Sequence, residues 1–395
     1  MNFPLTMNCV GHTLDVNSDL SAEYRHRFPI FEHTTYINSC SAGALADTVK
    51  KSYDTYLSTM ELEGSAWTAW VDRQEIVRVL LARLLNVSAS EIAVTTSATA
   101  GINAVISALN FGKGRNKIVT TEHEFPTIGQ IMHAQEGRGA KVVHVAANSE
   151  NVFEVESFAR AIDDETALVA ITQVCFRNGS LTDLDPIIEI AHSHGSLVLV
   201  DAYQGLGAVP LDLSTCKADF LVGGALKYLL GAPGAGFLFA RASTTSQLHP
   251  TVTGWFAARD IFAMEIHSYD PSPDARRFEA GTPAIPSLYP SAAGLEIVLE
   301  IGVDRIAKYV SGLHDALRAG ILGMGGRVVT PKYAHGAMLA VASRDEFAHV
   351  AALEGERVIT SNRDGSVRIS PHFYNNMIDV ESTLVALRKH SSLLA

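Results

Sequence analysis

The sequence predicts an α/β protein with a mostly parallel central sheet in a large domain and a smaller α+β domain after it. Short, continuously apolar runs such as 196–201 and 219–224 alternate with helical patterns through the middle of the chain. Strands that are apolar on both faces are typical of parallel sheets covered by helices on both sides. The chain has 395 residues, 47% of them hydrophobic and 18% charged, which is enough for two domains and a large core.

The elements of the large domain follow from their residues in order. A strand over 91–97 runs directly into a helix over 98–109. A further helix over 183–195 has a proline in its first turn and Gly195 at its end. Apolar or β-branched runs bounded by turn residues predict the remaining strands, at 117–122, 141–146, 167–174, 196–201, 219–224 and 236–240.

The pattern changes after Arg241, because residues 242–290 hold many turn residues and no long periodic element. One helical pattern then runs from Ser287 to about residue 321, and short strands are expected at 336–343 and 365–370 before a final polar helix. We therefore expect a small α+β domain over 285–395, a large domain over 31–284 and an N-terminal segment, 1–30, that packs on the small domain.

Composition narrows the function classes. The chain carries 31 basic and 42 acidic residues, a net charge of −11, which argues against a nucleic-acid partner. No apolar run approaches the roughly 18 residues of a membrane span, and the N-terminus shows no secretory signal. Four cysteines form neither a disulfide framework nor a metal-binding pair. These observations favour a cytoplasmic enzyme without a metal site, acting on a small molecule.

Asp201 and Lys227 are the most informative pair, since each follows an apolar strand, where open α/β sheets present ligand-binding groups. A buried ion pair is one interpretation. The other is a lysine that forms a Schiff base with pyridoxal phosphate, with an aspartate that pairs with the ring nitrogen and keeps it protonated. A dinucleotide site is disfavoured, because neither GLGAVP (205–210) nor GAPGAG (231–236) gives the G-x-G-x-x-G fingerprint between a strand and a helix.

The stretch with DAYQ (201–204) and GGALKYLLG (223–231) resembles the class V aminotransferase group of fold-type-I pyridoxal-phosphate enzymes, relatives of cysteine desulfurases and kynureninases. The resemblance spans about residues 33–380 and implies the fold-type-I transferase architecture and a homodimer. Further motifs of the group have counterparts, in order, in YINSCSAGAL (36–45), TTSATAGIN (95–103), RFEAGTP (277–283) and RISPHFYNN (368–376).

The resemblance also implies roles for residues around the cofactor ring. Lys227 would form the Schiff base and later move the α-proton of the substrate, and Asp201 would pair with the ring nitrogen. Gln204 would hydrogen-bond the 3′-oxygen of the ring. Phe125, in EHEFPT, would stack on the ring, with His123 as the alternative and an ordinary core position as the competing interpretation of Phe125.

Two further groups are expected at the phosphate and at the substrate. Ala98 and Thr99 lie at a predicted helix N-terminus, which favours an anion, and the resemblance implies that Thr282 reaches the phosphate of the partner subunit's cofactor. Arg368 matches the arginine that binds the substrate α-carboxylate, for which a guanidinium is well shaped, although a solvated strand-edge position is the alternative. Asn38 and Ser39 are expected near the same carboxylate.

The reaction is narrowed by what the sequence lacks. Desulfurases of this group need a cysteine in the C-terminal third, and this chain has none after Cys216. Kynureninases and epimerases usually carry histidine where Gln204 stands. The sequence therefore favours a β-eliminating C–S lyase acting on an S-substituted L-cysteine, as in pathways to sulfur-containing natural products. A decarboxylating or oxidatively deaminating enzyme, an epimerase and an aminotransferase remain alternatives, and a non-catalytic scaffold that binds pyridoxal phosphate is disfavoured.

Overall fold

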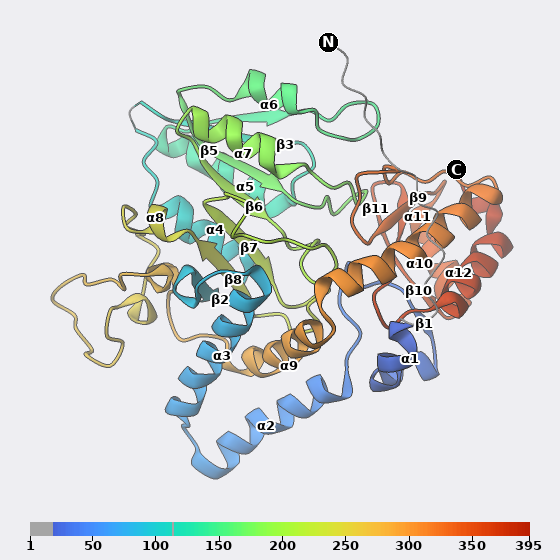
Figure 1. Cartoon of the computed structure of the whole chain (residues 1–395), viewed down its shortest axis with the longest axis horizontal. Helices are drawn as coiled ribbons and strands as arrows, with labels where there is room; N and C mark the ends of the chain where they lie inside the picture. The colour runs from blue at the N-terminus through green and yellow to red at the C-terminus, as the bar shows by residue number, and fades with distance from the viewer. Residues whose placement is uncertain (1–18, 113) are drawn as a thin grey trace.

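A twisted central sheet forms the body of the protein (Figure 1). The computed structural model describes residues 19–112 and 114–395, so most of the predicted N-terminal segment lies outside the described residues. Within them, seven strands form the sheet in the order β2-β8-β7-β6-β5-β3-β4. β8 is antiparallel to both of its neighbours, and the other pairs are parallel. The predicted α/β class with a mostly parallel sheet is confirmed. The strands are β2 (Ile92–Thr95), β3 (Lys117–Thr121), β4 (Lys141–Val145), β5 (Thr166–Thr172), β6 (Leu197–Asp201), β7 (Phe220–Gly224) and β8 (Gly236–Ala240).

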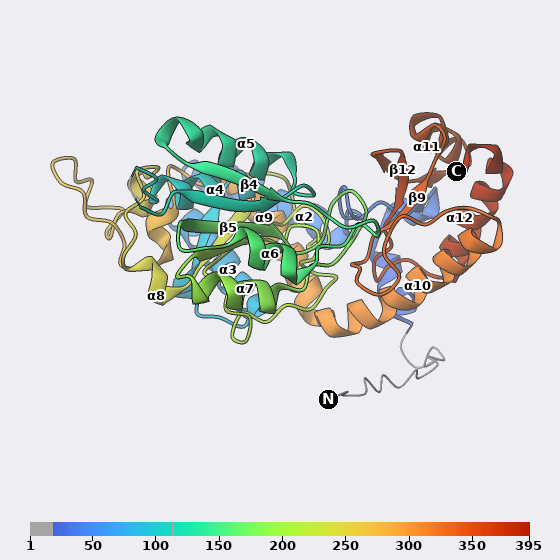
Figure 2. The ribbon, with the colours of Figure 1, turned by 90° about the horizontal axis from the view of Figure 1, so that it is seen from above.

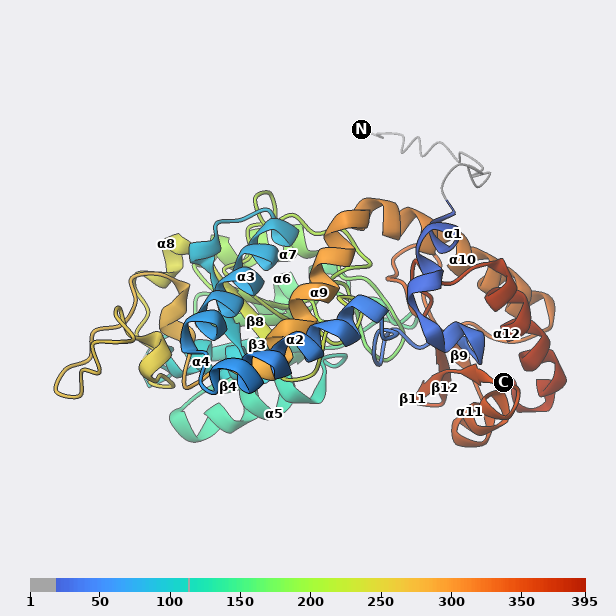
Figure 3. The same cartoon turned by 90° about the horizontal axis from the view of Figure 1, so that it is seen from below.

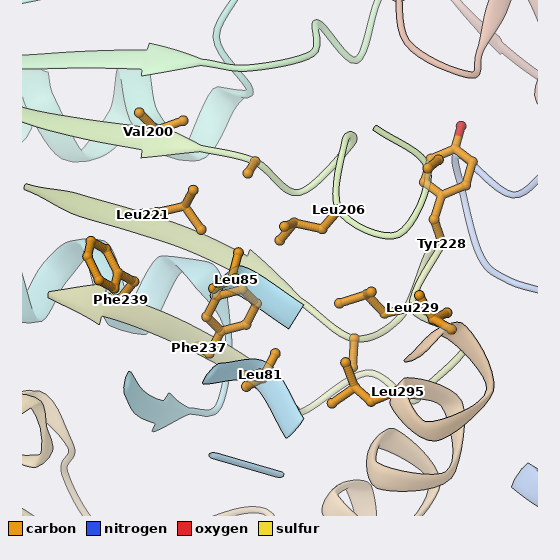
Figure 4. Close-up of a cluster of buried hydrophobic side chains, with 14 of the residues drawn as sticks. Leu81, Leu85, Val200, Leu206, Leu221, Tyr228, Leu229, Phe237, Phe239 and Leu295 are labelled. Atoms are coloured by element: carbon orange, nitrogen blue, oxygen red, sulfur yellow. The ribbon is translucent and has the colours of Figure 1, made fainter. Parts of the chain in front are cut away.

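Helices cover both faces of this sheet, which explains why its strands are apolar throughout (Figure 2). On one face, α4 (Ala98–Ser107) and α5 (Pro126–Ala134) contribute to a core with Leu168, Leu199 and Leu238. The core on the other face contains Val169, Val198 and Phe239 and part of it is drawn in Figure 4. The helices over that face are α3 (Trp67–Leu85), α6 (Val155–Ala161), α7 (Leu184–Ser193) and α9 (Ile285–Ile301).

The helical pattern predicted as one element from Ser287 to about residue 321 is two helices, so that prediction is wrong. α9 ends at Ile301, before Gly302, whose φ of 87° lies in the left-handed region, and α10 (Val303–Gly323) begins directly after that glycine. α9 packs alongside α2 (Asp47–Glu63) and α3, as Figure 3 shows from below. α10 leads away to the smaller C-terminal unit.

The C-terminal unit is built on a small antiparallel sheet with helices. In the described part of the chain, its strands follow the order β11-β12-β9 and pack with α10 around Leu313, Leu317 and Val341. A segment near the N-terminus joins this C-terminal unit, because β1 (Thr35–Tyr36) pairs in parallel with β10 (Val358–Ile359). The predicted domain boundaries stay a prediction. The remaining elements are α1 (Leu20–Tyr24), α8 (Ala242–Thr245), β9 (Leu339–Ala342), α11 (Glu346–Gly355), β11 (Ser361–Arg363), β12 (Ser366–Ile369) and α12 (Met377–Lys389).

None of the helices among residues 19–112 and 114–395 combines the length and the hydropathy that crossing a membrane requires.

Candidate active site

A cavity of about 260 Å³ opens at the carboxyl ends of the parallel strands β5 and β6. Its wall also includes the N-terminus of α4, the turn before α5 and the segment that follows β7. This edge is where open α/β sheets bind their ligands, because the strands deliver side chains to it and the helices that follow begin there. Six of the residues predicted for the site line the cavity, namely Ala98, Thr99, Phe125, Asp201, Gln204 and Lys227.

Asp201 ends β6, where it is held beside Thr172 of β5 by the strand register. One carboxylate oxygen, Oδ1, accepts a hydrogen bond of 2.9 Å from the backbone N–H of Tyr203. Burial raises the pKa of Asp201, while the backbone bond and the charge of Lys227 pull it back. Because an opposite charge favours the ionised form of a buried carboxyl group, Asp201 gains from a cation placed in the cavity.

Lys227 lies in the turn after β7 with its Nζ atom 4.6 Å from the ring centroid of Tyr203 and 5.9 Å from that of Phe125. Burial lowers the pKa of Lys227; nearby Asp201 opposes the shift and Arg368 adds to it. A lysine in this state gives up its proton more readily than a solvated one, so its amine is available as a nucleophile or base.

The backbone of this turn is held by the segment at residues 40–43. The N–H of Gly43 donates to the carbonyl of Leu226 at 3.0 Å, and a Cβ atom at Gly43 would lie 2.5 Å from the carbonyl oxygen of Lys227. That separation is too short for any side chain, so glycine is required where the two segments meet. The carbonyl of Cys40 also accepts a hydrogen bond of 3.1 Å from Nε2 of Gln204.

Phe125 and His123 take different positions. Phe125 lines the cavity, packs edge-on against Phe176 with centroids 5.0 Å apart and is 42% exposed, which gives its ring a free face toward the cavity. His123 instead packs against Phe153 with ring centroids 5.0 Å apart, and it does not line the cavity. Burial lowers its pKa. The geometry favours Phe125 over His123 for stacking.

The N-terminus of α4 brings two predicted phosphate ligands to the cavity. Ser97 caps the helix by accepting a hydrogen bond of 3.1 Å from the N–H of Ala100, and Ala98 and Thr99 form the first turn. First-turn N–H groups have no partner inside the helix, and the helix dipole favours an anion beside them. Thr282 is exposed in the loop before α9 and does not line this cavity, so its predicted role across a subunit boundary stays a prediction.

Arg368 on β12 is buried beside the cavity rather than in its lining. Its guanidinium donates to the carbonyl of Phe176 at 3.0 Å and to the hydroxyl groups of Ser361 at 3.0 Å and Ser41 at 3.3 Å. Its Nε atom is buried and has no hydrogen-bond partner among the described residues. A buried N–H group without a hydrogen-bond acceptor destabilises the protein, unless a ligand supplies the acceptor.

Asn38 and Ser39 lie on the segment that leads toward Arg368, but neither lines the cavity. The hydroxyl group of Ser39 is buried and lies 2.7 Å from that of Tyr374. Asn38 forms a parallel bridge with Ser370, two residues beyond Arg368. Their predicted contact with a substrate carboxylate stays a prediction.

Sequence reasoning missed several residues of the site. Tyr203, Phe176 and Thr172 line the cavity, and Glu124 is buried and accepts a hydrogen bond from the N–H of Thr172. Tyr203 could have been found, because it lies between two predicted site residues in DAYQ. Glu124 lies between His123 and Phe125 in EHEFPT, but nothing local in the sequence indicates its contact with Thr172.

The polar and aromatic groups that line the cavity match the chemical groups of pyridoxal phosphate. The Oε1 atom of Gln204 is buried without a hydrogen-bond partner among the described residues, and a carboxamide can present either its oxygen or its NH₂ group to a ring oxygen. Asp201 offers an anion for a protonated ring nitrogen, Phe125 offers an aromatic face, and α4 offers N–H groups for a phosphate. Lys227 lies among them.

Comparisons with known proteins agree with this arrangement. The family described as aminotransferase class V matches residues 43–382. The uncharacterized aminotransferase YcbU of Bacillus subtilis (strain 168) is 32% identical over 360 residues, covering 90% of this chain and 94% of that protein. A kynureninase of Geobacillus thermodenitrificans (strain NG80-2) is 30% identical over 298 residues, covering 72% of this chain and 69% of that protein.

Among solved structures, the cystine C–S lyase C-DES in complex with its reaction product cysteine persulfide superposes with a TM-score of 0.84 at 21% identity. The match covers 91% of this chain and 99% of that one, and it confirms the predicted fold type. With the family match over most of the chain, the predicted family and cofactor are confirmed as well. The chain belongs to the class V aminotransferase family and is a pyridoxal-phosphate-dependent enzyme.

Proposed function

We propose that this enzyme cleaves the Cβ–S bond of an S-substituted L-cysteine by β-elimination, giving a thiol, pyruvate and ammonia. The observation that carries the proposal is a lysine and an aspartate that share one cavity in a chain with no cysteine after Cys216. Cys40, Cys175 and Cys216 are all buried, so no exposed thiol among the described residues is placed to accept sulfur. Elimination needs no such acceptor, because a thiolate leaves by itself.

The residues of the cavity would divide the work of holding the cofactor. Lys227 attaches it, Asp201 pairs with its ring nitrogen, Gln204 meets its ring oxygen and Phe125 covers one face of the ring. Ala98 and Thr99 hold its phosphate. When bound, pyridoxal phosphate supplies an electron sink that stabilises negative charge at the substrate Cα.

The remaining steps belong to side chains of this chain. Arg368 holds the substrate α-carboxylate through its unpartnered Nε atom and the adjacent Nη atoms, which fixes the orientation of Cα. The amine of Lys227, whose pKa burial lowers, takes the proton from Cα. The electron pair of the Cβ–S bond departs with sulfur, and the thiolate takes up a proton. Water then converts the three-carbon remainder to pyruvate and ammonia.

Attachment of the cofactor is tested by Lys227→Ala. This variant should bind pyridoxal phosphate without the visible absorption band that borohydride abolishes, and its turnover should fall by roughly three orders of magnitude or more because both base and attachment point are lost. Peptide mapping of borohydride-treated wild type should find the label on the peptide containing Lys227. A label on another lysine overturns the assignment.

The reaction is tested with a panel of S-substituted L-cysteines, assayed for free thiol and pyruvate in equal amounts. Three rival reactions give different products from the same compounds. Transamination gives a keto acid that keeps the C–S bond, epimerisation gives the D-isomer and decarboxylation releases CO₂. If one of these products forms instead of thiol and pyruvate, the proposed elimination is wrong and the corresponding reaction takes its place.

Transamination is the second candidate, favoured by the similarity to YcbU over 90% of this chain. It would use the same proton transfer by Lys227, with the substrate nitrogen retained by the enzyme and the C–S bond left intact. A keto acid that keeps the C–S bond, and that stops at one equivalent per active site when no amino-group acceptor is added, distinguishes transamination from elimination, which gives pyruvate in every turnover.

We also propose that the enzyme is a homodimer located in the cytoplasm. The excursion at residues 258–271, which extends from the body of the large sheet in Figure 2, exposes Phe262 by 60%, Met264 by 64% and Ile266 by 85%. A cluster of exposed apolar side chains is typical of a surface that another chain covers. Thr282 lies exposed beyond the same segment, which supports its predicted role at a subunit boundary.

A further inference from the structure

Glu124 is a buried carboxyl group beside the cavity that has no part in the reaction proposed above. It lies in the turn between β3 and α5, directly before Phe125, and is only 6% exposed. Its Oε1 atom accepts hydrogen bonds from the hydroxyl of Thr121 at 2.7 Å and from the N–H of Thr172 at 3.0 Å. Its Oε2 atom is buried and has no hydrogen-bond partner in the part of the chain that the structure describes.

These two bonds connect the segments that carry site residues. Thr172 lies opposite Asp201 in the register of β5 and β6, and its hydroxyl reaches the backbone oxygen of Asp201 at 3.4 Å. The carboxyl of Glu124 therefore joins the turn that carries Phe125 to the strand ends that carry Asp201. This connection therefore links Phe125, the residue proposed to cover the ring, with Asp201, the residue proposed to pair with its nitrogen.

The charge of Glu124 also matters to Asp201. Burial raises the pKa of Glu124 to about 8, and Asp201 contributes in the same direction, against the hydrogen bonds from Thr121 and Thr172. Two carboxyl groups in one buried region do not both ionise readily, so one keeps its proton. Asp201 lines the cavity and the charge of Lys227 favours its ionised form, whereas Glu124 does not line the cavity and Asp201 disfavours its ionisation, so Glu124 is the group that stays neutral.

Asp201 is the charged neighbour that matters for Glu124, because the other titratable groups nearby are neutral or act elsewhere. Burial raises the pKa of Cys175, the thiol after β5, and lowers the pKa of His123 in the same turn, so both are neutral near pH 7. The charge of Arg177 lowers the pKa of His123 and of Cys175, and the charge of Lys227 lowers the pKa of Asp201.

We propose that Glu124 is a positioning residue that acts through Asp201 and Phe125. As a neutral carboxylic acid it fixes the turn before Phe125 to the end of β5, and it leaves Asp201 as the negative charge that would pair with the ring nitrogen of the cofactor. The inference rests on the cofactor-binding roles given under the proposed function, but not on which bond of the substrate is cleaved.

The first test uses the enzyme without cofactor and compares the stability of Glu124→Gln with wild type across pH. Between about pH 4.5 and pH 8 an unfolded chain has lost the proton that folded Glu124 keeps, so the free energy of unfolding of wild type falls as pH rises. Glutamine has no proton to lose. The melting temperature of the variant should therefore rise relative to wild type from pH 5 to pH 8 and then stay level.

Glu122→Gln is the matched control, because Glu122 lies two residues earlier in the same turn and is exposed. Its melting temperature should follow that of wild type over this pH range. A constant difference between Glu124→Gln and wild type from pH 5 to pH 8 shows that Glu124 is ionised in the folded protein and overturns the proposal.

The second test titrates the enzyme with pyridoxal phosphate and records the visible circular dichroism of the bound ring. Glu124→Gln keeps a neutral group with an oxygen acceptor, so its dissociation constant should stay within about threefold of wild type, with the same dichroic band. Glu124→Ala should bind at least about tenfold more weakly, with a reduced band, because the turn and Asp201 are no longer fixed to each other.

Rescue by glutamine separates positioning from a need for charge. If Glu124→Gln binds the cofactor as weakly as Glu124→Ala, an ionised carboxylate is required and the proposal is wrong. If Glu124→Ala binds like wild type, Glu124 positions nothing. Should Glu124→Ala fail to fold, the Glu124→Gln titration still decides, since loss of affinity there overturns the proposal and retention supports it. None of these measurements depends on the products, so a failed lyase assay leaves them interpretable.

Discussion

Arg368 is a buried side chain that is held in place by several contacts and is still partly unsatisfied. Its guanidinium is fixed by Phe176, Ser361 and Ser41, yet its Nε atom has no partner in the described part of the chain. Fixed donors lose little entropy when a carboxylate binds, which favours affinity and orientation together. The position was expected from the sequence, but its burial beside the cavity wall was not.

Arg368→Gln should raise KM for the amino-acid substrate by roughly tenfold to a hundredfold, because a charge-assisted pair is removed. Arg368→Lys should recover only part of the loss, since an ammonium group cannot bind a carboxylate bidentately. Arg388→Gln is the control, because Arg388 is exposed in the last turn of α12. An unchanged KM in Arg368→Gln would place the carboxylate elsewhere.

The sequence predicted those site residues that lie in motifs at the ends of strands. Lys227, Asp201, Gln204 and Phe125 share one cavity because strand ends and the turns after them bring them there. It did not find Glu124, because its importance comes from a cross-strand contact with Thr172 that nothing local in the sequence indicates. The roles of all these residues stay predictions until they are measured.

Among the elements, a buried ionic network holds α3 against β2 and the segment before α9. Glu279 is buried and accepts hydrogen bonds from Arg78 at 2.7 Å, from Gln74 at 3.1 Å and from the N–H of Val94 at 2.8 Å. Burial raises the pKa of Glu279 and the charge of Arg78 lowers it, so the carboxylate is stable only with its partner in place. The network fixes the segment that continues to Thr282.

Glu279→Ala should lower the free energy of unfolding by about 3–5 kcal/mol, because it leaves Arg78 buried and without its main counter-charge. Glu75→Gln should cost less than about 1 kcal/mol, since Glu75 is the exposed partner of the same arginine and such pairs contribute little. Denaturant unfolding of the enzyme without cofactor measures both. Equal losses in the two variants would contradict a network centred on Glu279.

The elements that the sequence predicted well are the strands of the large sheet, because strands buried on both faces are apolar without interruption. The helical pattern that continues past Gly302 could not be divided correctly, because the residues on both sides of that glycine keep helical spacing. α2 gave little signal, since Val49 is its only buried residue among the described ones, and amphipathic periodicity needs a buried face to be visible.

At the level of the whole molecule, the proposed dimer would bury the exposed apolar side chains of the excursion at 258–271 against the partner subunit. Ile266→Asp combined with Phe262→Asp should shift the enzyme from dimer to monomer in light scattering, because burying two carboxylates in an apolar interface is costly. The monomer should also bind pyridoxal phosphate more weakly if Thr282 serves the partner subunit.

Glu346→Gln is a control for that experiment, because Glu346 lies in the C-terminal unit at the start of α11 and should not change the mass. A double variant that stays dimeric would place the interface on another surface. An active wild-type monomer at working concentration would mean that the site is complete within one chain.

The antiparallel strand β8 has a consequence for how the protein is made. β2 is an edge strand whose hydrogen-bond partner lies far along the chain, since Ile92 pairs with Phe239. While the polypeptide emerges from the ribosome, β2 must wait for β8 to be synthesised, and α3 must wait longer for α9, beside which it packs. The nascent chain therefore exposes the apolar surface of β2 and α3 until these later segments are made, and exposed surface of this kind makes incomplete chains prone to aggregation.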